Sequence, residues 1–269
     1  MSDVFDFVQG STPLVVSVPH DGRLLTPGME ARMTDAGRAL PDTDWHVRQL
    51  YEFAEGLGAT VIAARYSRYV VDLNRASTDE SLYDGQVATG LCPQKTFDGD
   101  AIYRDGEGVT AEEQQARVTD YWQPYHDRIA ELLAGARERF GYALLWDAHS
   151  IPSEVPRLFD GRLPALNIGT NDGRSCAGSI TRAVTGIASG SGYSTVVDGR
   201  FRGGHITRHF GAPQDNVHAI QLELSQRNYM DEIELGYDAE RAARLAVTIE
   251  AMLRAFLSAA SDHYDQDEA

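Results

Sequence analysis

Three short apolar runs of strand length each carry a histidine or a glutamate, and this pattern restricts the possible fold more than any other feature of the chain. His20 and His149 end the first two runs, and Glu223 lies in the third. Such runs are typical of buried strands in α/β proteins, which bind ligands in the crevice beyond the carboxyl ends of their strands. We therefore expect the three side chains to meet in one crevice. The runs are residues 14–20, 143–149 and 219–224.

The residue types at these positions predict a metal site. Two imidazoles with a carboxylate suit a zinc ion that keeps one coordination position free, as catalytic zinc does, although another divalent ion would also fit. Taken singly, each histidine could instead be a turn residue with an ordinary hydrogen bond. Asp44 is the expected third ligand, because Asp42 fits better as the N-cap of the following helix. Asp21 and Asp147 are the alternatives, and Asp147 could also orient a histidine or cap a turn.

Strand-like and helix-like segments alternate along the chain, which predicts an α/β fold with a mixed β-sheet sandwiched by helices. The short link between residues 59–64 and 68–73 implies an antiparallel pair of strands. Residues 76–109 are expected to form a long functional loop. The other expected strands are residues 14–18, 143–147, 164–168, 193–197 and 218–224. The expected helices are residues 44–57, 110–138, 176–187 and 239–259.

Two of these helices begin at clear capping residues. Thr110 and Glu113 form a capping box, in which each side chain accepts a hydrogen bond from a free backbone amide at the helix start. Asp238 is the expected N-cap of the last helix, which is strongly periodic. Because the sequence has no internal repeat and no linker, we expect a single domain over residues 1–269, with a solvated acidic tail at residues 261–269.

Charge and composition exclude several classes of protein. The formal net charge of −16 and the sequence pI of about 4.8 argue against nucleic acid or an anionic membrane as a partner. Cys92 and Cys176 are the only cysteines, which fits a reducing compartment and excludes a disulfide scaffold. The sequence has no signal-peptide pattern and no apolar stretch of the roughly 18 residues that a membrane helix needs. We therefore expect a cytoplasmic protein.

Glu223 is a candidate catalytic residue because it lies between Leu222 and Leu224 in an apolar strand. A buried carboxylate is costly unless it is paired or neutralised, so a glutamate in such a strand indicates a function. If Gln221, Glu223 and Ser225 share one face of the strand, that face is polar and lines a cleft. Beside a zinc-bound water, Glu223 could act as a general base.

A cluster of arginines predicts that the protein binds a small anion. Arg65, Arg68 and Arg75 gather in the expected strand pair. The guanidinium group binds a carboxylate through two parallel hydrogen bonds, which makes arginine a common carboxylate receptor. The alternative is structural, with these arginines pairing with the surplus acidic residues of the chain.

The segment of residues 199–209 is rich in glycine, arginine and histidine. His205 and His209 have the i,i+4 spacing of two zinc ligands on one helix. However, the pair Gly203-Gly204 favours a loop at this position. We therefore expect residues 199–209 to bind substrate and not to hold a second zinc ion.

Six ordered blocks make the sequence resemble the N-formylglutamate amidohydrolase (deformylase) family over roughly residues 10–235. The family resembles the zinc carboxypeptidases in fold, which implies a mixed sheet sandwiched by helices. The blocks are residues 18–22 (VPHDG), 42–45 (DTDW), 67–75 (SRYVVDLNR), 146–150 (WDAHS), 203–208 (GGHITR) and 221–225 (QLELS).

The wider resemblance to the carboxypeptidases implies roles for individual residues. His20 and His149 match the two histidine ligands, and Glu223 matches the catalytic glutamate. Asn74 and Arg75 match the pair that grips a substrate carboxylate. One position departs from the pattern, because the carboxypeptidases place a carboxylate ligand three residues after the first histidine. This chain has Arg23 there, so Asp44 is the expected replacement.

The activity that the resemblance implies is the zinc-dependent cleavage of N-formyl-L-glutamate to formate and L-glutamate, the last step of a histidine degradation route. Arg68 would stabilise the tetrahedral oxyanion, and Arg75 would hold a substrate carboxylate, with Arg208 or His205 as a second carboxylate receptor. One alternative is a related deacylase that acts on another N-acyl amino acid. The other is a non-catalytic anion-binding protein on the same scaffold.

Overall fold

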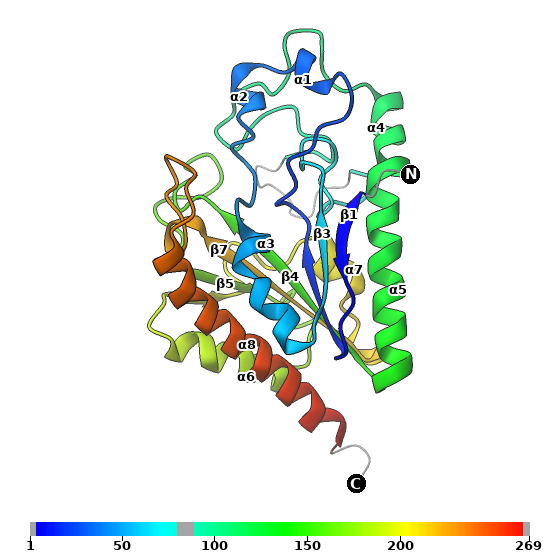
Figure 1. The fold of residues 1–269 in the computed structure, drawn as a ribbon, viewed down its shortest axis with the longest axis vertical. Coiled ribbons are helices and arrows are strands. Elements are labelled where there is room, and N and C mark those ends of the chain that lie inside the picture. The colour runs from blue at the N-terminus through cyan, green and yellow to red at the C-terminus, as the bar shows by residue number, and fades with distance from the viewer. Residues whose placement is uncertain (1–3, 80–88, 266–269) are drawn as a thin grey trace.

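The computed structural model describes residues 4–79 and 89–265. Its core is a seven-stranded sheet (Figure 1). The strands are β1 (Phe5–Val8), β2 (Leu14–Val18), β3 (Thr60–Ala64), β4 (Ala143–Ile151), β5 (Leu166–Gly169), β6 (Thr195–Val197) and β7 (Val217–Ser225). Their order in the sheet is β1-β3-β2-β4-β7-β5-β6. The four central strands run parallel, whereas β1 is antiparallel to β3 and β5 is antiparallel to β7, so the sheet is mixed as expected.

The antiparallel partner of β3 is not the one that the sequence predicts. β3 pairs with β1, an edge strand that the apolar pattern did not reveal. Residues 68–73 form turns, so the prediction of a strand there is wrong. Val70 and Val71 are apolar because they belong to two buried hydrophobic clusters and not because they pair with another strand.

Helices cover both faces of the sheet (Figure 1). Helices α3 (Val47–Leu50), α6 (Gly178–Gly190) and α8 (Ala239–Asp265) pack on one face, and α5 (Gln123–Phe140) packs on the other. The short helices are α1 (Met29–Arg32), α2 (Asp35–Arg38), α4 (Ala111–Arg117) and α7 (His205–Phe210). None of the helices in the described part of the chain is long and apolar enough to cross a membrane.

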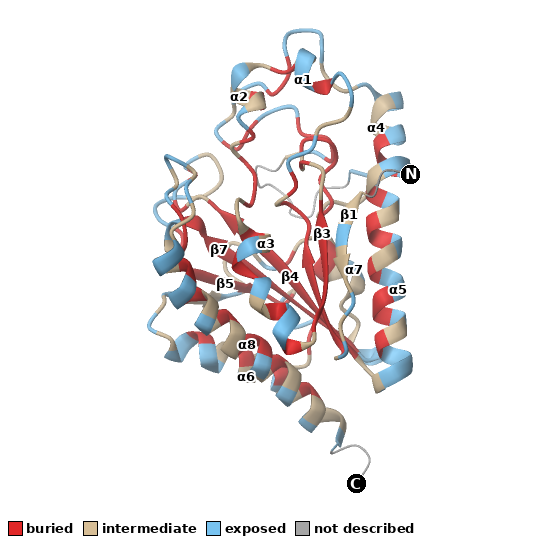
Figure 2. Ribbon diagram, viewed as in Figure 1, coloured by how far each residue is buried: buried red, intermediate tan, exposed pale blue. Residues whose placement is uncertain are grey.

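The two covered faces explain why the central strands read as continuous apolar runs. Successive side chains of a strand point to opposite faces. In β4, Leu144 and Trp146 join the cluster under α8, whereas Ala143 and Leu145 join the cluster under α5. Every residue of β2, β4 and β7 is therefore buried (Figure 2).

The helix expected over residues 110–138 is present, but it contains a π-helical turn at Val118–Trp122 between α4 and α5. The hydroxyl of Thr110 accepts the backbone amide of Glu113 at 3.2 Å, as the capping box predicts. Pro124 has no backbone N–H, so the α-helical hydrogen bonding is interrupted at this point.

Two other predicted elements differ from the structure. The helix expected over residues 44–57 is split into α3 and a 3₁₀ helix at Glu52–Leu57. The loop expected over residues 199–209 ends in helix α7, so its second half is helical. At the last helix, Asp238 accepts the backbone amide of Arg241 at 2.9 Å, which agrees with its predicted role as a cap.

Two predicted irregular segments lie partly outside the described residues. Residues 76–79 and 89–109 contain turns and isolated bridges, in agreement with a long loop, and residues 80–88 are outside the described part. The expected acidic tail is helical as far as residue 265, because α8 continues through it, and its last four residues are also outside.

Candidate active site

The parallel strands β2, β4 and β7 deliver the predicted residues to the same edge of the sheet. His149 in β4 is in register with Glu223 in β7. β2 pairs Ser17 with Asp147 of β4, so His20 lies just beyond the end of β2 at this edge. His20, His149 and Glu223 are buried, and all three line one pocket. The structure thus brings together three side chains that lie 129 and 74 positions apart along the sequence.

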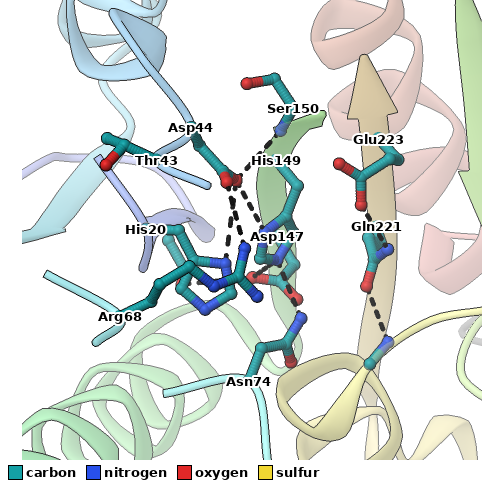
Figure 3. Close-up of polar contacts among 12 residues, drawn as sticks. His20, Thr43, Asp44, Arg68, Asn74, Asp147, His149, Ser150, Gln221 and Glu223 are labelled. Carbon is teal, nitrogen blue, oxygen red and sulfur yellow. Dashed lines mark hydrogen bonds and ion pairs between the residues drawn. The ribbon is translucent and has the colours of Figure 1, made fainter. Parts of the chain in front are cut away.

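His20, Asp44 and His149 form a compact buried cluster at this pocket (Figure 3). Oδ2 of Asp44 is 3.1 Å from Nδ1 of His149 and 3.8 Å from Nδ1 of His20. The same oxygen accepts the backbone amide of Ser150 at 3.0 Å. One ligand atom from each of the three residues lies within 4.8 Å of the others. Across residues 4–79 and 89–265, this is the one group of three or more histidine, cysteine, aspartate or glutamate side chains that could hold a metal ion.

A further carboxylate contacts the opposite edge of each imidazole. Nε2 of His20 is 2.8 Å from Oδ1 of Asp72, and Nε2 of His149 is 3.1 Å from Oδ1 of Asp147. Metal-binding histidines typically donate their other ring N–H to a carboxylate, which fixes the ring and leaves the remaining nitrogen for the metal. Asp147 therefore has the position of an orienting residue, one of the roles that the sequence left open for it.

Arg68 links the two carboxylates on the His20 side of the cluster. Its guanidinium group is 2.7 Å from Oδ2 of Asp72 and 3.6 Å from Oδ1 of Asp44. Burial alone would raise the pKa of Asp72, but Arg68 and His20 hold that pKa well below its usual value. Burial would also raise the pKa of Asp44, but His149, His20 and Arg68 together lower it. Both carboxylates are therefore ionised at neutral pH.

The other aspartates near the cluster have structural partners. The carboxylate of Asp42 accepts the backbone amide of Phe97 at 3.0 Å. The carboxylate of Asp21 accepts the backbone amides of His46 and Arg48 at the start of α3. The prediction that Asp42 caps this helix is therefore wrong, because Asp21 binds the free amides there.

The cluster fits a divalent metal ion. Nδ1 of His20 and Oδ1 of Asp44 are buried and have no hydrogen-bond partner among the described residues. A buried polar atom without a partner costs about 1–3 kcal/mol, and a cation bound between the two atoms would remove this cost. Two imidazole nitrogens with a carboxylate oxygen are a donor set that zinc and similar divalent ions accept.

Glu223 faces the pocket from β7, beside Gln221 (Figure 3). Burial raises the pKa of Glu223 to about 8, although the charge of His149 opposes this shift. Nε2 of Gln221 is 3.5 Å from Oε2 of Glu223, and Oε1 of Gln221 accepts the backbone amide of Gly204 at 2.7 Å. Ser225 is buried but is not one of the described residues that line the pocket. A carboxyl group with such a pKa can take up and release a proton near neutral pH.

Asn74 and Arg75 reach the same pocket from the segment that follows β3. Nδ2 of Asn74 is 2.9 Å from Nε2 of His149, and Oδ1 of Asn74 accepts the backbone amide of Ile206 at 2.8 Å. Arg75 lines the pocket, where its guanidinium group donates to Oγ1 of Thr89 at 3.5 Å. By contrast, the side chain of Arg65 is 39% exposed, lies 3.8 Å from Asp6 and does not line the pocket.

His205, His209 and Arg208 lie on helix α7, behind the pocket. The rings of His205 and His209 stack with a centroid distance of 5.1 Å. Nε of Arg208 donates to the carbonyl oxygen of Gly203 at 2.7 Å. Of the residues that the structure describes at the pocket wall, none of these three is a member. The substrate-binding roles of His205 and Arg208 therefore stay predictions.

The pocket also contains two charged residues that the sequence did not single out, namely Asp72 and Arg200, although Arg200 belongs to the segment 199–209 that was expected to bind substrate. The i,i+4 spacing of Arg68 and Asp72 is a signal that could have indicated Asp72. Arg200 lies in the glycine-rich segment 199–209, where spacing alone does not distinguish one arginine from the next. Phe201 and Gly204 of the same segment also line the pocket, and the lining residues without a predicted role are Thr89, Phe97, Ser150, Ile151 and Leu158.

Comparisons with known proteins identify relatives of this chain in sequence and in fold. Residues 12–230 match the family described as N-formylglutamate amidohydrolase. The chain is 50% identical over 266 residues to a protein of Pseudomonas aeruginosa named N-formylglutamate deformylase, with 98% of this chain and 100% of the relative covered. It is 45% identical over 268 residues to a Pseudomonas putida protein of the same name, with 99% and 100% covered. The crystal structure of N-formylglutamate amidohydrolase from Ralstonia eutropha JMP134 has the same fold, with a TM-score of 0.80, 23% identity, and 93% of this chain and 96% of that chain covered.

Proposed function

The chain belongs to the N-formylglutamate amidohydrolase family, and we propose that it is a metal-dependent enzyme that hydrolyses N-formyl-L-glutamate to formate and L-glutamate. The observation that carries this proposal is the buried cluster of His20, Asp44 and His149 in one pocket with Glu223 and several arginines. As the family resemblance implies, the reaction would be the last step of a histidine degradation route. The residues of the site come from strands and loops along most of the chain, and they meet at one edge of one sheet. We therefore also propose that residues 1–269 form one domain.

In this proposal, His20, Asp44 and His149 hold the metal ion. When bound, a divalent ion such as zinc would supply Lewis-acid chemistry, because it acidifies water and polarises a carbonyl group. The orienting contacts of Asp72 and Asp147 with the imidazole Nε2 atoms support this assignment. The unpartnered atoms of His20 and Asp44 support it independently.

The residues of the chain divide the remaining work of an amide hydrolysis. Glu223 accepts a proton from the attacking water and passes it to the departing amine, and a pKa of about 8 means that its carboxyl group exists in both the charged and the neutral form near neutral pH. Arg68 donates hydrogen bonds to the negative oxygen of the tetrahedral intermediate. Arg75, with Asn74 beside it, holds a substrate carboxylate through its guanidinium group.

The direct test of the proposal is a metal assay of the purified protein together with hydrolysis of a small panel of N-acyl amino acids. We expect about one divalent ion per chain and the highest kcat/KM for N-formyl-L-glutamate. A preference for another N-acyl amino acid would indicate the related deacylase activity. Binding of anions without any hydrolysis by the metal-loaded protein would indicate a non-catalytic role.

Replacing Asp72 with asparagine is expected to weaken metal binding. The change removes the negative charge that holds Nε2 of His20 and keeps its ring in place. Loss of such an orienting carboxylate typically costs about 10–100-fold in metal affinity. A calorimetric metal titration measures the effect, with Asp35→Asn as a control, because Asp35 is exposed and does not line the pocket. Equal metal affinity in the two variants would mean that Asp72 does not support the site.

Replacing Arg75 with alanine is expected to lower kcat/KM for N-formylglutamate by an amount equivalent to roughly 2–5 kcal/mol, because a desolvated substrate carboxylate loses its partner. Metal content should not change. Arg75→Lys should recover only part of the loss, since an ammonium group cannot form two parallel hydrogen bonds. Arg65→Ala is the matched control, as this arginine lies outside the pocket. If Arg75→Ala and Arg65→Ala behaved alike, Arg75 would not be a carboxylate receptor.

A further inference from the structure

We propose that Thr207 is a positioning residue of the metal site, because its hydroxyl group holds the carboxylate that orients His149. Thr207 lies in helix α7, within the block of residues 203–208, and it is not among the described residues that line the pocket. This inference rests on the proposed function, because it concerns one of the three ligands of the proposed metal ion.

The carboxylate of Asp147 depends on side-chain partners. Asp147 is fully buried in β4, between Ser17 of β2 and Gln221 of β7. A buried carboxylate without hydrogen-bond partners is costly. Its Oδ1 atom lies 3.1 Å from Nε2 of His149, and its Oδ2 atom accepts the hydroxyl group of Thr207 at 3.2 Å. The two oxygens of Asp147 therefore have different partners, one in β4 and one in α7.

The contact with Thr207 restricts the rotation of this carboxylate. A carboxyl group that is held at only one oxygen can turn about the bond to its own side chain, which weakens its contact with the imidazole. Thr207 holds the second oxygen from a different element, so Oδ1 stays directed at Nε2 of His149. The other ring nitrogen, Nδ1, then faces Oδ2 of Asp44 at 3.1 Å, on the side of the metal-binding cluster. An orienting carboxylate of this kind fixes the ring of a metal-binding histidine.

A second hydroxyl group reaches the same carboxylate through a longer contact. Oγ of Ser17 lies 3.4 Å from Oδ1 of Asp147 and 3.1 Å from the hydroxyl oxygen of Tyr125. A contact of 3.4 Å is close to the limit of a hydrogen bond. Thr207 has the shorter contact, and it binds the oxygen that His149 does not use. The role of holding the carboxylate therefore belongs to Thr207.

The side chain of Thr207 has little freedom to turn away from Asp147. It is fully buried, and a Cβ atom added at Gly203 would lie 3.0 Å from its Cγ2 atom, so the methyl group packs closely against this glycine. A threonine in a helix has few χ1 rotamers, because its Cβ atom carries two branches. The packing of the methyl group therefore also fixes the direction of the hydroxyl group.

The helix that carries Thr207 is itself bound to the active site. The carbonyl oxygen of Asn74 accepts the backbone amide of His205 at 3.2 Å, and Oδ1 of Asn74 accepts that of Ile206 at 2.8 Å. These two bonds satisfy free amides at the start of α7 and hold Thr207 at a fixed place beside the sheet. Helix α7 therefore supports the metal site, a role separate from the substrate binding that the sequence predicts for this segment.

The zinc affinity of three variants tests the proposal. Thr207→Val has nearly the shape of the wild type but no hydroxyl group, whereas Thr207→Ser keeps the hydroxyl group and loses the methyl group. Thr170→Val is the matched control, since the hydroxyl group of Thr170 is also buried and also donates to a carboxylate, that of Asp198, which lies outside the pocket. Each protein would be freed of metal with a chelator and titrated with Zn²⁺ in competition with a chelating dye.

We expect Thr207→Val to lower the zinc affinity about 3- to 10-fold, the effect of one lost hydrogen bond. Thr207→Ser and Thr170→Val should bind zinc like the wild type, although Thr170→Val should lose thermal stability, as Thr207→Val does. Wild-type zinc affinity in Thr207→Val overturns the proposal. An equal loss of affinity in Thr207→Ser or in Thr170→Val overturns it too, because the hydroxyl group of Thr207 would then have no special part.

A second measurement separates the hydroxyl group from general packing. In the background of Asp147→Asn, Thr207→Val should lower the zinc affinity no further, because Thr207 acts through this carboxylate. An equal effect in both backgrounds overturns the proposal. If Thr207→Val does not fold, Thr207→Ala takes its place under the same criteria. If the wild type itself bound no divalent ion, the metal site of the proposed function would be wrong, and the role of Thr207 would fall with it.

Discussion

Replacing Glu223 with glutamine is expected to lower kcat for N-formylglutamate by roughly 10²–10⁴-fold, the usual contribution of a general base. Glutamine has nearly the same size but cannot accept the proton of the attacking water. The pKa of Glu223, raised to about 8 by burial, also suits the second half of its task, in which the carboxyl group gives the proton to the amine. Steady-state kinetics with saturating substrate measures the effect.

Metal content and fold should be unchanged in Glu223→Gln, because this residue is not among the three that could hold the metal. A useful control is Gln221→Leu, which removes the side-chain contacts of Gln221 but leaves the carboxylate of Glu223 in place. This control should lose less activity than Glu223→Gln. A decrease in kcat of less than threefold for Glu223→Gln would exclude Glu223 as the base.

The variants His20→Ala and His149→Ala are expected to lose bound metal and turnover together. Each change removes one of three ligands and leaves Asp44 with fewer partners in a buried site. Elemental analysis of the purified variants and their kcat for N-formylglutamate measure the two losses. Asp44→Ala should behave in the same way.

His209→Ala is the matched control for the histidine variants, because His209 is exposed on α7 and lies outside the pocket. It should keep metal and activity. Full metal content and near-normal turnover in His20→Ala or His149→Ala would show that the metal site is assigned wrongly. If Asp44→Ala kept its metal while Asp147→Ala lost it, the third ligand would be Asp147.

The strands at the centre of the sheet and the edge strand β6 were predictable from the sequence, whereas the other edge strand, β1, was not. β4 and β7 are buried on both faces, so they appear as apolar runs. β1 is short and has an exposed residue, Asp6, so it leaves no comparable pattern. The apolar pair Val70-Val71 indicated burial correctly, but burial in a turn and burial in a strand produce the same local pattern.

The site was predictable to the extent that its residues follow strands. His20, His149 and Glu223 lie at or near strand ends, and strand ends converge in any parallel sheet. Asp72 and Arg200 lie in turns and loops, and their positions depend on contacts with distant segments, such as that of Asp72 with His20. Local spacing contains no information on such contacts. Asp44 could be predicted as a metal ligand only because few other aspartates lie next to a predicted helix start.

Helix α8 packs on one face of the sheet but is made after all seven strands. Leu245, Ile249 and Phe256 of this helix belong to the same hydrophobic cluster as Trp146 in β4. Until α8 has left the ribosome, the part of this face that α8 covers stays exposed, even though all seven strands, α3 and α6 have already been made. A nascent chain with an exposed apolar sheet is prone to association with other chains. Because α8 follows all seven strands in the sequence, the nascent chain is exposed to this hazard until α8 has been made.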